Sequence, residues 1–284
     1  MGCLRPMAGS VGHEWVGDEA VWRLAACRLL LVVTTRYSCP GPWMSVLFGF
    51  HLREYVLLAT DTRITWYPKG QAVRWKDDQS KLQRTSLGLI GGCGLVSLLD
   101  CVKERFQDYE IRHTDDIVRV IHEEHARVRK EVQFGDARVR ESLKQTGWMF
   151  TYLGCDDPKH VARENTFLRL GIYHPDVSEK QRGIIPTGEA AVLMPSGTTQ
   201  EQFEDMSAAA NEGLRTGEDL SDFQQNLQYH IQFVAALIRT VSEWNSTVSP
   251  TFQVGVHSWT YGSGISNIAG DGRPLSLVVG RESG

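Results

Sequence analysis

A serine, an aspartate, a lysine and two adjacent glycines occur in order between positions 45 and 92, and their types suit nucleophilic chemistry. The hydroxyl of Ser45 is a weak nucleophile unless a base lies beside it. A residue at the very start of a chain carries such a base itself, an α-amine with a pKa of about 7.7–8.0. Ser45 therefore has the parts of a nucleophile that supplies both the attacking oxygen and the proton acceptor, provided that nothing precedes it.

Each of these positions also has a purely structural interpretation. A serine such as Ser45 often begins a strand, and Asp61 to Arg63 reads as a turn. Lys81 fits a solvated strand edge, and residues 91–94 fit a turn that leads into a helix. The order and the intervals of the whole set favour the functional interpretation.

Short β-rich runs must position the serine and the aspartate. Residues 45–50 and 55–60 are apolar and flank a polar corner, which predicts two antiparallel strands. Residues 81–85 and 87–91 predict a second strand pair. After the glycine turn, apolar residues recur at three- and four-residue steps from Leu95 to Tyr109, which predicts a helix.

The remainder alternates between the same two kinds of element. A second helix is expected from Thr114, whose side chain suits an N-cap. Further strands are expected at 148–154, 166–173, 190–194, 252–259 and 275–279, and further helices at 200–214 and 220–244. Because each sheet must bury one face against the other and its outer face under helices, the order predicts an α+β fold, a four-layer αββα sandwich.

Four segments resemble the opening of proteasome β subunits and their bacterial relatives of the HslV and Anbu types. They are 45–49, 59–65, 81–82 and 90–92. Gly49 and Asp61 follow Ser45 by four and sixteen residues, as in that family, whereas the later intervals need one insertion and a shorter hairpin. The resemblance extends more weakly over 45–284 and implies the fold of N-terminal nucleophile (Ntn) hydrolases.

The resemblance implies a role for each matching residue. Ser45 would be the nucleophile, and Lys81 a nearby cation that keeps the α-amine neutral and lowers the pKa of the hydroxyl. Asp61 would pair with Lys81, which is physically consistent because a buried carboxylate needs a partner. The N–H of Gly92, expected at the start of a helix, would stabilise an oxyanion by about 3–4 kcal/mol.

Four further positions can be compared with the family, and at one of them the residue type differs. Ser196 resembles a serine that supports the amine, and Ser246 stands where the family has an aspartate, with Pro250 in place of a glycine. Thr65 matches a position whose backbone pairs with an extended substrate. Ile90 matches a position at the base of the specificity pocket, and its apolar side chain indicates a substrate with an apolar residue before the cleaved bond.

The predicted function is an N-terminal serine amidohydrolase or peptidase that acts on a peptide or small amide through an acyl-enzyme on Ser45. Transfer of the acyl group to an amine would use the same residues. A noncatalytic ring or scaffold subunit is the rival, favoured by Ser246 and an uncleaved leader and opposed by Asp61 and Lys81. The resemblance implies a homo-oligomer, a ring or a stack, and neither a metal nor an organic cofactor.

Residues 1–44 are interpreted as a leader, because they show no sustained period. Met44 directly precedes the serine. Translation from Met44 followed by methionine removal would free Ser45, and this is favoured over cleavage of a propeptide. Domain 45–284 then carries the function.

Composition narrows the class of protein. With 284 residues, 42% of them hydrophobic, the chain is long enough for one large domain with a core. The net charge of −4 gives no positive field for nucleic acid or an anionic membrane. Six cysteines without a C-x-x-C pair fit the reducing cytoplasm, and the apolar run 29–33 is too short to span a membrane.

Overall fold

The structure is a computed structural model, and it describes nine stretches of the chain. These are residues 45–66, 74–108, 111–131, 137–144, 146–155, 166–174, 183–216, 222–270 and 272–278. The predicted leader, 1–44, lies outside the described residues.

Six antiparallel strands form the larger sheet, in the order β10-β1-β2-β11-β12-β13. Its centre is built from strands that are distant in sequence, because β2 pairs with β1 on one side and with β11 on the other. The strands are β1 (Leu47–His51), β2 (Tyr55–Asp61), β10 (Glu189–Leu193), β11 (Phe252–Ser258), β12 (Gly262–Ile268) and β13 (Pro274–Val278).

A second antiparallel sheet has five strands in the order β5-β6-β7-β8-β9, and a separate hairpin joins β3 to β4. The five strands are β5 (Leu82–Thr85), β6 (Gly88–Cys93), β7 (Gly147–Cys155), β8 (Thr166–Tyr173) and β9 (Gly183–Ile185). The hairpin consists of β3 (Arg63–Trp66) and β4 (Arg74–Asp77).

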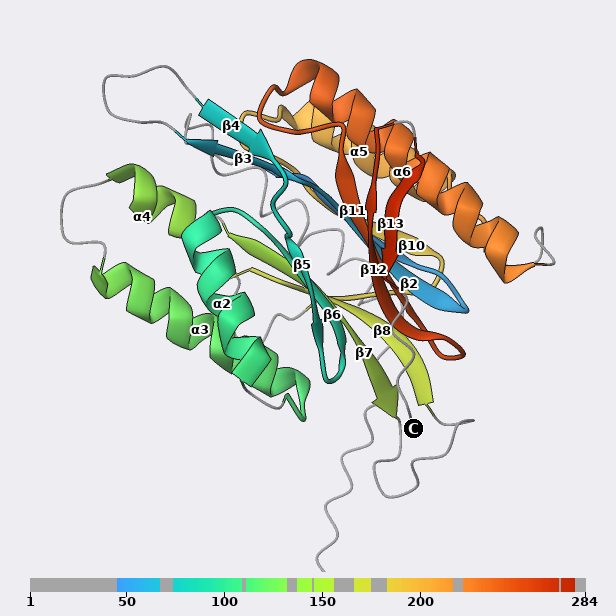
Figure 1. The fold of residues 1–284 in the computed structure, drawn as a ribbon, viewed down its shortest axis with the longest axis horizontal. Coiled ribbons are helices and arrows are strands. Elements are labelled where there is room, and N and C mark those ends of the chain that lie inside the picture. Colours follow the sequence, from blue (N-terminus) through green and yellow to red (C-terminus); the bar gives the residue numbers. More distant parts are fainter. Residues whose placement is uncertain are drawn as a thin grey trace, which may run out of the picture.

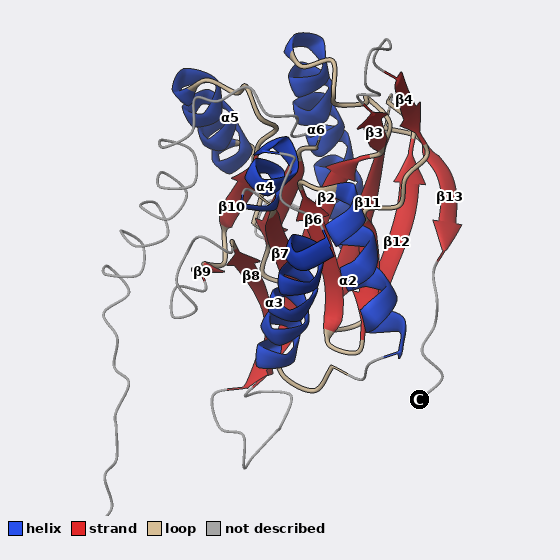
Figure 2. Cartoon of the chain, turned by 90° about the vertical axis from the view of Figure 1, so that its left-hand side faces the viewer, coloured by secondary structure: helices blue, strands red, loops and turns tan. Residues whose placement is uncertain are grey.

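Helices cover the outer faces of both sheets (Figures 1 and 2). Helices α5 and α6 pack against the larger sheet, and α2 and α3 pack against the smaller one. The helices are α2 (Val96–Asp108), α3 (Thr114–Glu131), α4 (Ala137–Lys144), α5 (Gln200–Glu212) and α6 (Phe223–Trp244).

Alternation along β1 decides which side chains face the second sheet. Phe48 and Phe50 belong to the core cluster beneath α5 and α6, whereas Leu47 belongs to the cluster between the two sheets. Gly49 also faces the second sheet, since a Cβ there would lie 2.8 Å from Met149 Sδ. Because side chains alternate along a strand, Ser45 lies on the same side as Leu47.

The prediction of an α+β chain with antiparallel strands is confirmed. The predicted strands and helices occur with shifted ends, and the structure adds elements that the pattern missed: β3, β4, β9, β12 and α4. One local expectation is wrong. Gly91 and Gly92 do not form a turn but belong to β6, and the bend comes at Gly94, which has a φ of 139°.

Candidate active site

Ser45, Lys81 and Asp61 meet at the ends of three strands. Ser45 lies just before β1, Asp61 ends β2, and Lys81 directly precedes β5. Lys81 Nζ lies 2.7 Å from Ser45 Oγ and 3.0 Å from Asp61 Oδ1. The three residues are 1%, 2% and 0% exposed, in the order Ser45, Lys81, Asp61. The sequence prediction that these side chains lie together is therefore met by their geometry.

Asp61 is surrounded by N–H donors. Oδ1 accepts from Val46 N at 3.1 Å as well as from Lys81, and Oδ2 accepts from Arg63 N at 2.9 Å and from Ser249 N at 3.4 Å. Burial raises the pKa of Asp61, while the Lys81 ammonium and these backbone donors oppose the rise. A carboxylate with four donors has its lone pairs satisfied, so the surroundings suit the ionised form.

Burial acts on Lys81 in the opposite sense. Removal from water lowers the pKa of Lys81, and the carboxylate of Asp61 limits that fall. A lysine held in this way reaches its neutral form at a lower pH than an exposed one, whose pKa is about 10.4. Its Nζ lies within hydrogen-bond distance of the Ser45 hydroxyl, to which it donates.

Cys93, the last residue of β6, holds the backbone of the serine. Its Sγ–H donates to the carbonyl oxygen of Ser45 at 2.9 Å, and the side chain is buried. Burial raises the pKa of Cys93 to about 12. The thiol is therefore protonated near neutral pH and acts as a hydrogen-bond donor, not as a nucleophile.

The Arg63 side chain joins the two strands of the β3–β4 hairpin through an ion pair and also contacts the turn after α6. Arg63 contacts Asp77 through two bonds, Nε to Oδ1 at 2.7 Å and Nη2 to Oδ2 at 2.8 Å. Arg63 Nη1 also donates to the carbonyl oxygen of Ser246 at 2.7 Å. Hydrogen bonds from Arg63, and more weakly from the Ser249 hydroxyl, lower the pKa of Asp77. The structure thus places Ser246 as an exposed turn residue held by its carbonyl.

Gly92 is not at a helix start, contrary to the sequence prediction. It lies within β6 opposite Trp148, and α2 begins only at Val96. A Cβ at Gly92 would lie 2.3 Å from Leu99 Cδ2 and 2.9 Å from the Trp148 ring. The close packing of these two side chains requires glycine at this position, and no helix dipole is directed through its N–H.

The other candidate residues lie apart from the buried cluster in different ways. The Ser196 carbonyl accepts from Asn245 Nδ2 at 3.3 Å. Thr65 pairs with Trp75 in the β3–β4 hairpin. Ile90 is 1% exposed and packs in the core beneath α2 and α3. The substrate-binding roles of Thr65 and Ile90 stay predictions.

Sequence reasoning missed several residues that contribute to the surroundings of the cluster, among them Cys93, Asp77 and Ser249. Cys93 follows the glycine pair, and its contact depends on how the two sheets face each other. Asp77 falls in a polar stretch without a period, which hides β4. Ser249 lies between Ser246 and Pro250, and the donation from its backbone N–H to Asp61 carries no signal in a side-chain pattern.

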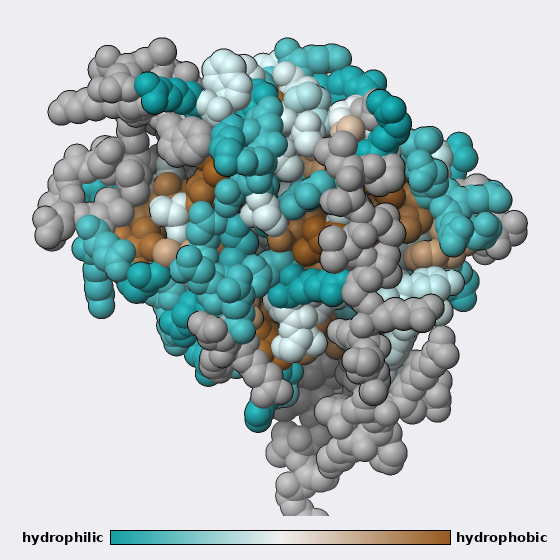
Figure 3. Space-filling model, viewed as in Figure 1, coloured by the Kyte–Doolittle hydropathy of each residue, from teal (hydrophilic) through white to brown (hydrophobic). Residues whose placement is uncertain are grey.

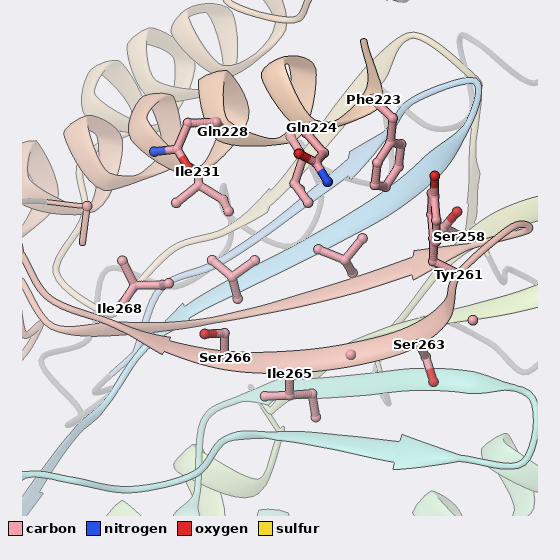
Figure 4. A pocket seen from close by; sticks show the side chains of 16 residues that line it. Phe223, Gln224, Gln228, Ile231, Ser258, Tyr261, Ser263, Ile265, Ser266 and Ile268 are labelled. Carbon is pink, nitrogen blue, oxygen red and sulfur yellow. The ribbon is translucent and has the colours of Figure 1, made fainter. Parts of the chain in front are cut away.

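An apolar groove of about 420 Å³ lies elsewhere, between α6 and the β11–β12 pair (Figure 4). On the face of the molecule that Figure 3 shows, hydrophobic patches lie among hydrophilic residues. Val254 and Val256 line the groove, whereas Gly255 between them faces Leu82 of the second sheet. The groove is therefore on the opposite face of β11 from Ser45. Its lining includes Phe223, Leu227, Ile231, Tyr261, Ile265 and Ile268.

Two absences concern the described part of the chain. No group of three or more His, Cys, Asp or Glu side chains that could hold a metal ion occurs there. Among the same residues, every helix is too short or too polar to cross a membrane.

Comparison with known protein families gives no matching family model, and comparison with curated proteins gives no match either. What the site can do is therefore judged from its own contacts.

Proposed function

We propose that the chain is an N-terminal serine amidohydrolase or peptidase with the four-layer αββα architecture of Ntn hydrolases. The observation that supports the proposal is the contact of Lys81 Nζ with both Ser45 Oγ at 2.7 Å and Asp61 Oδ1 at 3.0 Å. A serine, a buried lysine and a carboxylate so arranged can activate a hydroxyl without a metal or an organic cofactor.

In the proposed reaction, the Ser45 oxygen attacks the carbonyl carbon of a peptide or small amide. Its proton passes to a neutral amine, either the freed α-amine of Ser45 or Lys81 Nζ. The new C–O bond forms, the C–N bond breaks, and the leaving amine takes up the proton. Water then attacks the ester on Ser45 and regenerates the hydroxyl. Asp61 stabilises positive charge on Lys81. The Gly92 N–H, the oxyanion donor that the resemblance implies, would have to act from within β6 without a helix dipole.

Two alternatives use particular features of the same site. If an amine replaces water in the second step, the protein is a peptide transferase. If the site is inert, the chain is a noncatalytic ring or scaffold subunit, and the 1% exposure of Ser45 favours that alternative. Each version includes assembly of identical chains in the cytoplasm into a ring or a stack, with neither nucleic acid nor membrane as partner.

The decisive experiment combines chemistry at Ser45 with the start of the mature chain. We expect intact mass and N-terminal sequencing of the native protein to give a chain that begins at Ser45, and a β-lactone to acylate that residue. Ser45→Ala is expected to abolish both labelling and turnover of peptide or amide substrates. Ser207→Ala on α5 makes the same change far from the cluster and is expected to keep both. A native chain that begins at Met1, or turnover that survives Ser45→Ala, refutes the proposal.

A further inference from the structure

A buried glutamine on β11 reaches across to the backbone of Lys81. Gln253 is 4% exposed. It lies two residues before Gly255 on β11, so both residues are on the face of the strand that is directed toward the second sheet. Gln253 Oε1 accepts from Lys81 N at 2.7 Å and from Leu82 N at 3.2 Å. One side chain thus satisfies two consecutive backbone donors where the chain enters β5.

The other end of the same amide is also engaged. Gln253 Nε2 donates to Ser80 Oγ at 3.2 Å and to Asn267 Oδ1 at 2.9 Å. Because the two backbone N–H groups can only donate, the end of the amide that faces them must be the oxygen, and this fixes the orientation of the side chain. The four hydrogen bonds use the two donors of the Nε2 group and both lone pairs of Oε1.

Lys81 is therefore held at both ends. Gln253 fixes its backbone N–H, and Ser45 and Asp61 contact its Nζ. We propose that Gln253 is a positioning residue, whose carboxamide sets the place of the Lys81 backbone so that Nζ stays between Ser45 and Asp61. The inference rests on the proposed function of Ser45 and assigns to β11 a part in that site.

The electrostatic surroundings of Lys81 make the proposal testable by titration. The groups that act on Lys81 are Asp61 from β2, the protonated thiol of Cys93 from β6 and Asp77 from β4. A carboxylate at position 253 would add a further negative charge at the lysine backbone. It would favour the ammonium form, so the acid limb of the pH–rate profile should move to higher pH.

Three variants separate positioning from plain stability. Gln253→Leu removes both acceptor bonds, and Gln253→Glu keeps an oxygen for the two N–H groups. Asn226→Leu is the matched control, because it removes another buried amide, on α6 at the other face of the larger sheet. For Gln253→Leu we expect kcat to fall by about 10- to 100-fold, the order of loss for a displaced catalytic group, with KM nearly unchanged.

For Gln253→Glu we expect most of kcat to return at the pH optimum, with the acid limb shifted upward. Asn226→Leu is expected to keep kcat and the pH profile of the wild type even if it lowers the free energy of unfolding. A folded Gln253→Leu protein with wild-type kcat overturns the inference. Equal losses of kcat in Gln253→Leu and Asn226→Leu overturn it as well.

A second readout does not need turnover. The Lys81 Nζ of protein with isotope-labelled lysine can be titrated by NMR in the wild type and in each variant. We expect its titration to shift in both Gln253 variants and to stay in place in Asn226→Leu. If turnover does not depend on Ser45 but the Lys81 titration shifts as expected, the proposed function fails and the positioning stands. If the titration is unmoved in Gln253→Leu, the positioning fails.

Discussion

At the scale of the residue, the carboxylate of Asp61 connects the ends of distant segments. It accepts hydrogen bonds from the backbone of Val46, Arg63 and Ser249 and from the side chain of Lys81. An amide in its place would turn an NH₂ group toward two of these donors. The site therefore depends on the charge of this residue as well as on its shape.

Asp61→Asn is expected to have two separate effects. The free energy of unfolding should fall by about 1–3 kcal/mol, because the NH₂ group cannot accept from the donors that face it. The acid limb of kcat/KM should move to lower pH, because the Asp61 carboxylate raises the pKa of Lys81 and its loss removes that effect. Urea unfolding and a pH–rate profile measure the two effects. An acid limb that stays in place would show that Lys81 does not titrate in the rate.

The residues of the cluster differed in how far the sequence could predict them. Ser45 and Asp61 were predicted because the interval between them matches a family pattern, and Lys81 was predicted from the same pattern with one insertion before it. Cys93 and Gln253 were not, since their contacts depend on how β6 and β11 face the serine and the lysine across the two sheets. That arrangement is a property of the packed sheets, and no interval along the chain encodes it.

At the scale of the element, one hydrogen-bond chain joins strands of the two sheets. The hydroxyl of Thr151 on β7 accepts from Leu89 N on β6 at 2.8 Å and lies 2.8 Å from His257 Nδ1 on β11. The hydroxyl can donate its proton to Nδ1 when that nitrogen is unprotonated, as it can be in a neutral imidazole. Burial lowers the pKa of His257 to about 4, in agreement with this geometry.

The contact between Thr151 and His257 predicts that the free energy of unfolding falls in acid. Because the folded-state pKa of His257 lies below the unfolded value of about 6.5, the unfolded chain binds the proton first as the pH falls. The stabilisation is complete above about pH 6.5 and is lost toward pH 4, by about 3 kcal/mol in total. In His257→Gln, whose Oε1 can accept from Thr151, this part of the pH dependence should vanish. Urea unfolding at pH 7 and pH 4.5 compares the proteins, and parallel losses in both would contradict the assignment.

Strands with dense apolar residues were predicted, and strands without them were not. The apolar residues of β2 and β6 indicated strands directly, whereas β12 has the sequence GSGISNI, in which glycine and serine suppress the signal. Its seven residues pair with all of β11, so the neighbouring strand supplies the order that the local sequence lacks. The hairpin of β3 and β4 was missed for a similar reason, because β4 is exposed along its whole length.

At the scale of the whole molecule, the approach of the two sheets is set partly by Gly49. A Cβ at this position would lie 2.8 Å from Met149 Sδ and 2.9 Å from Leu170 Cδ2, side chains of the facing sheet. The glycine belongs to β1, which begins two residues after Ser45. The distance between the sheets and the position of the serine are therefore coupled through one strand.

Gly49→Val is expected to lower the free energy of unfolding by about 1–3 kcal/mol, because it overpacks the layer between the sheets. Displacement of β1 should also reduce turnover that depends on Ser45. Adding Leu170→Ala creates room for the new side chain, so the double variant should be more stable than the sum of the two single changes implies. Urea unfolding of all four proteins gives the coupling, and strict additivity would contradict the proposed contact.

The wide separation of the site residues along the chain bears on the timing of biosynthesis. Ser45 and Lys81 leave the ribosome well before Ser249 and Gln253, which complete the surroundings of Asp61 and Lys81. A nascent chain therefore holds a serine whose ammonium partner is not yet anchored. The surroundings of that serine are therefore complete only once the segment that carries Ser249 and Gln253 has also been made.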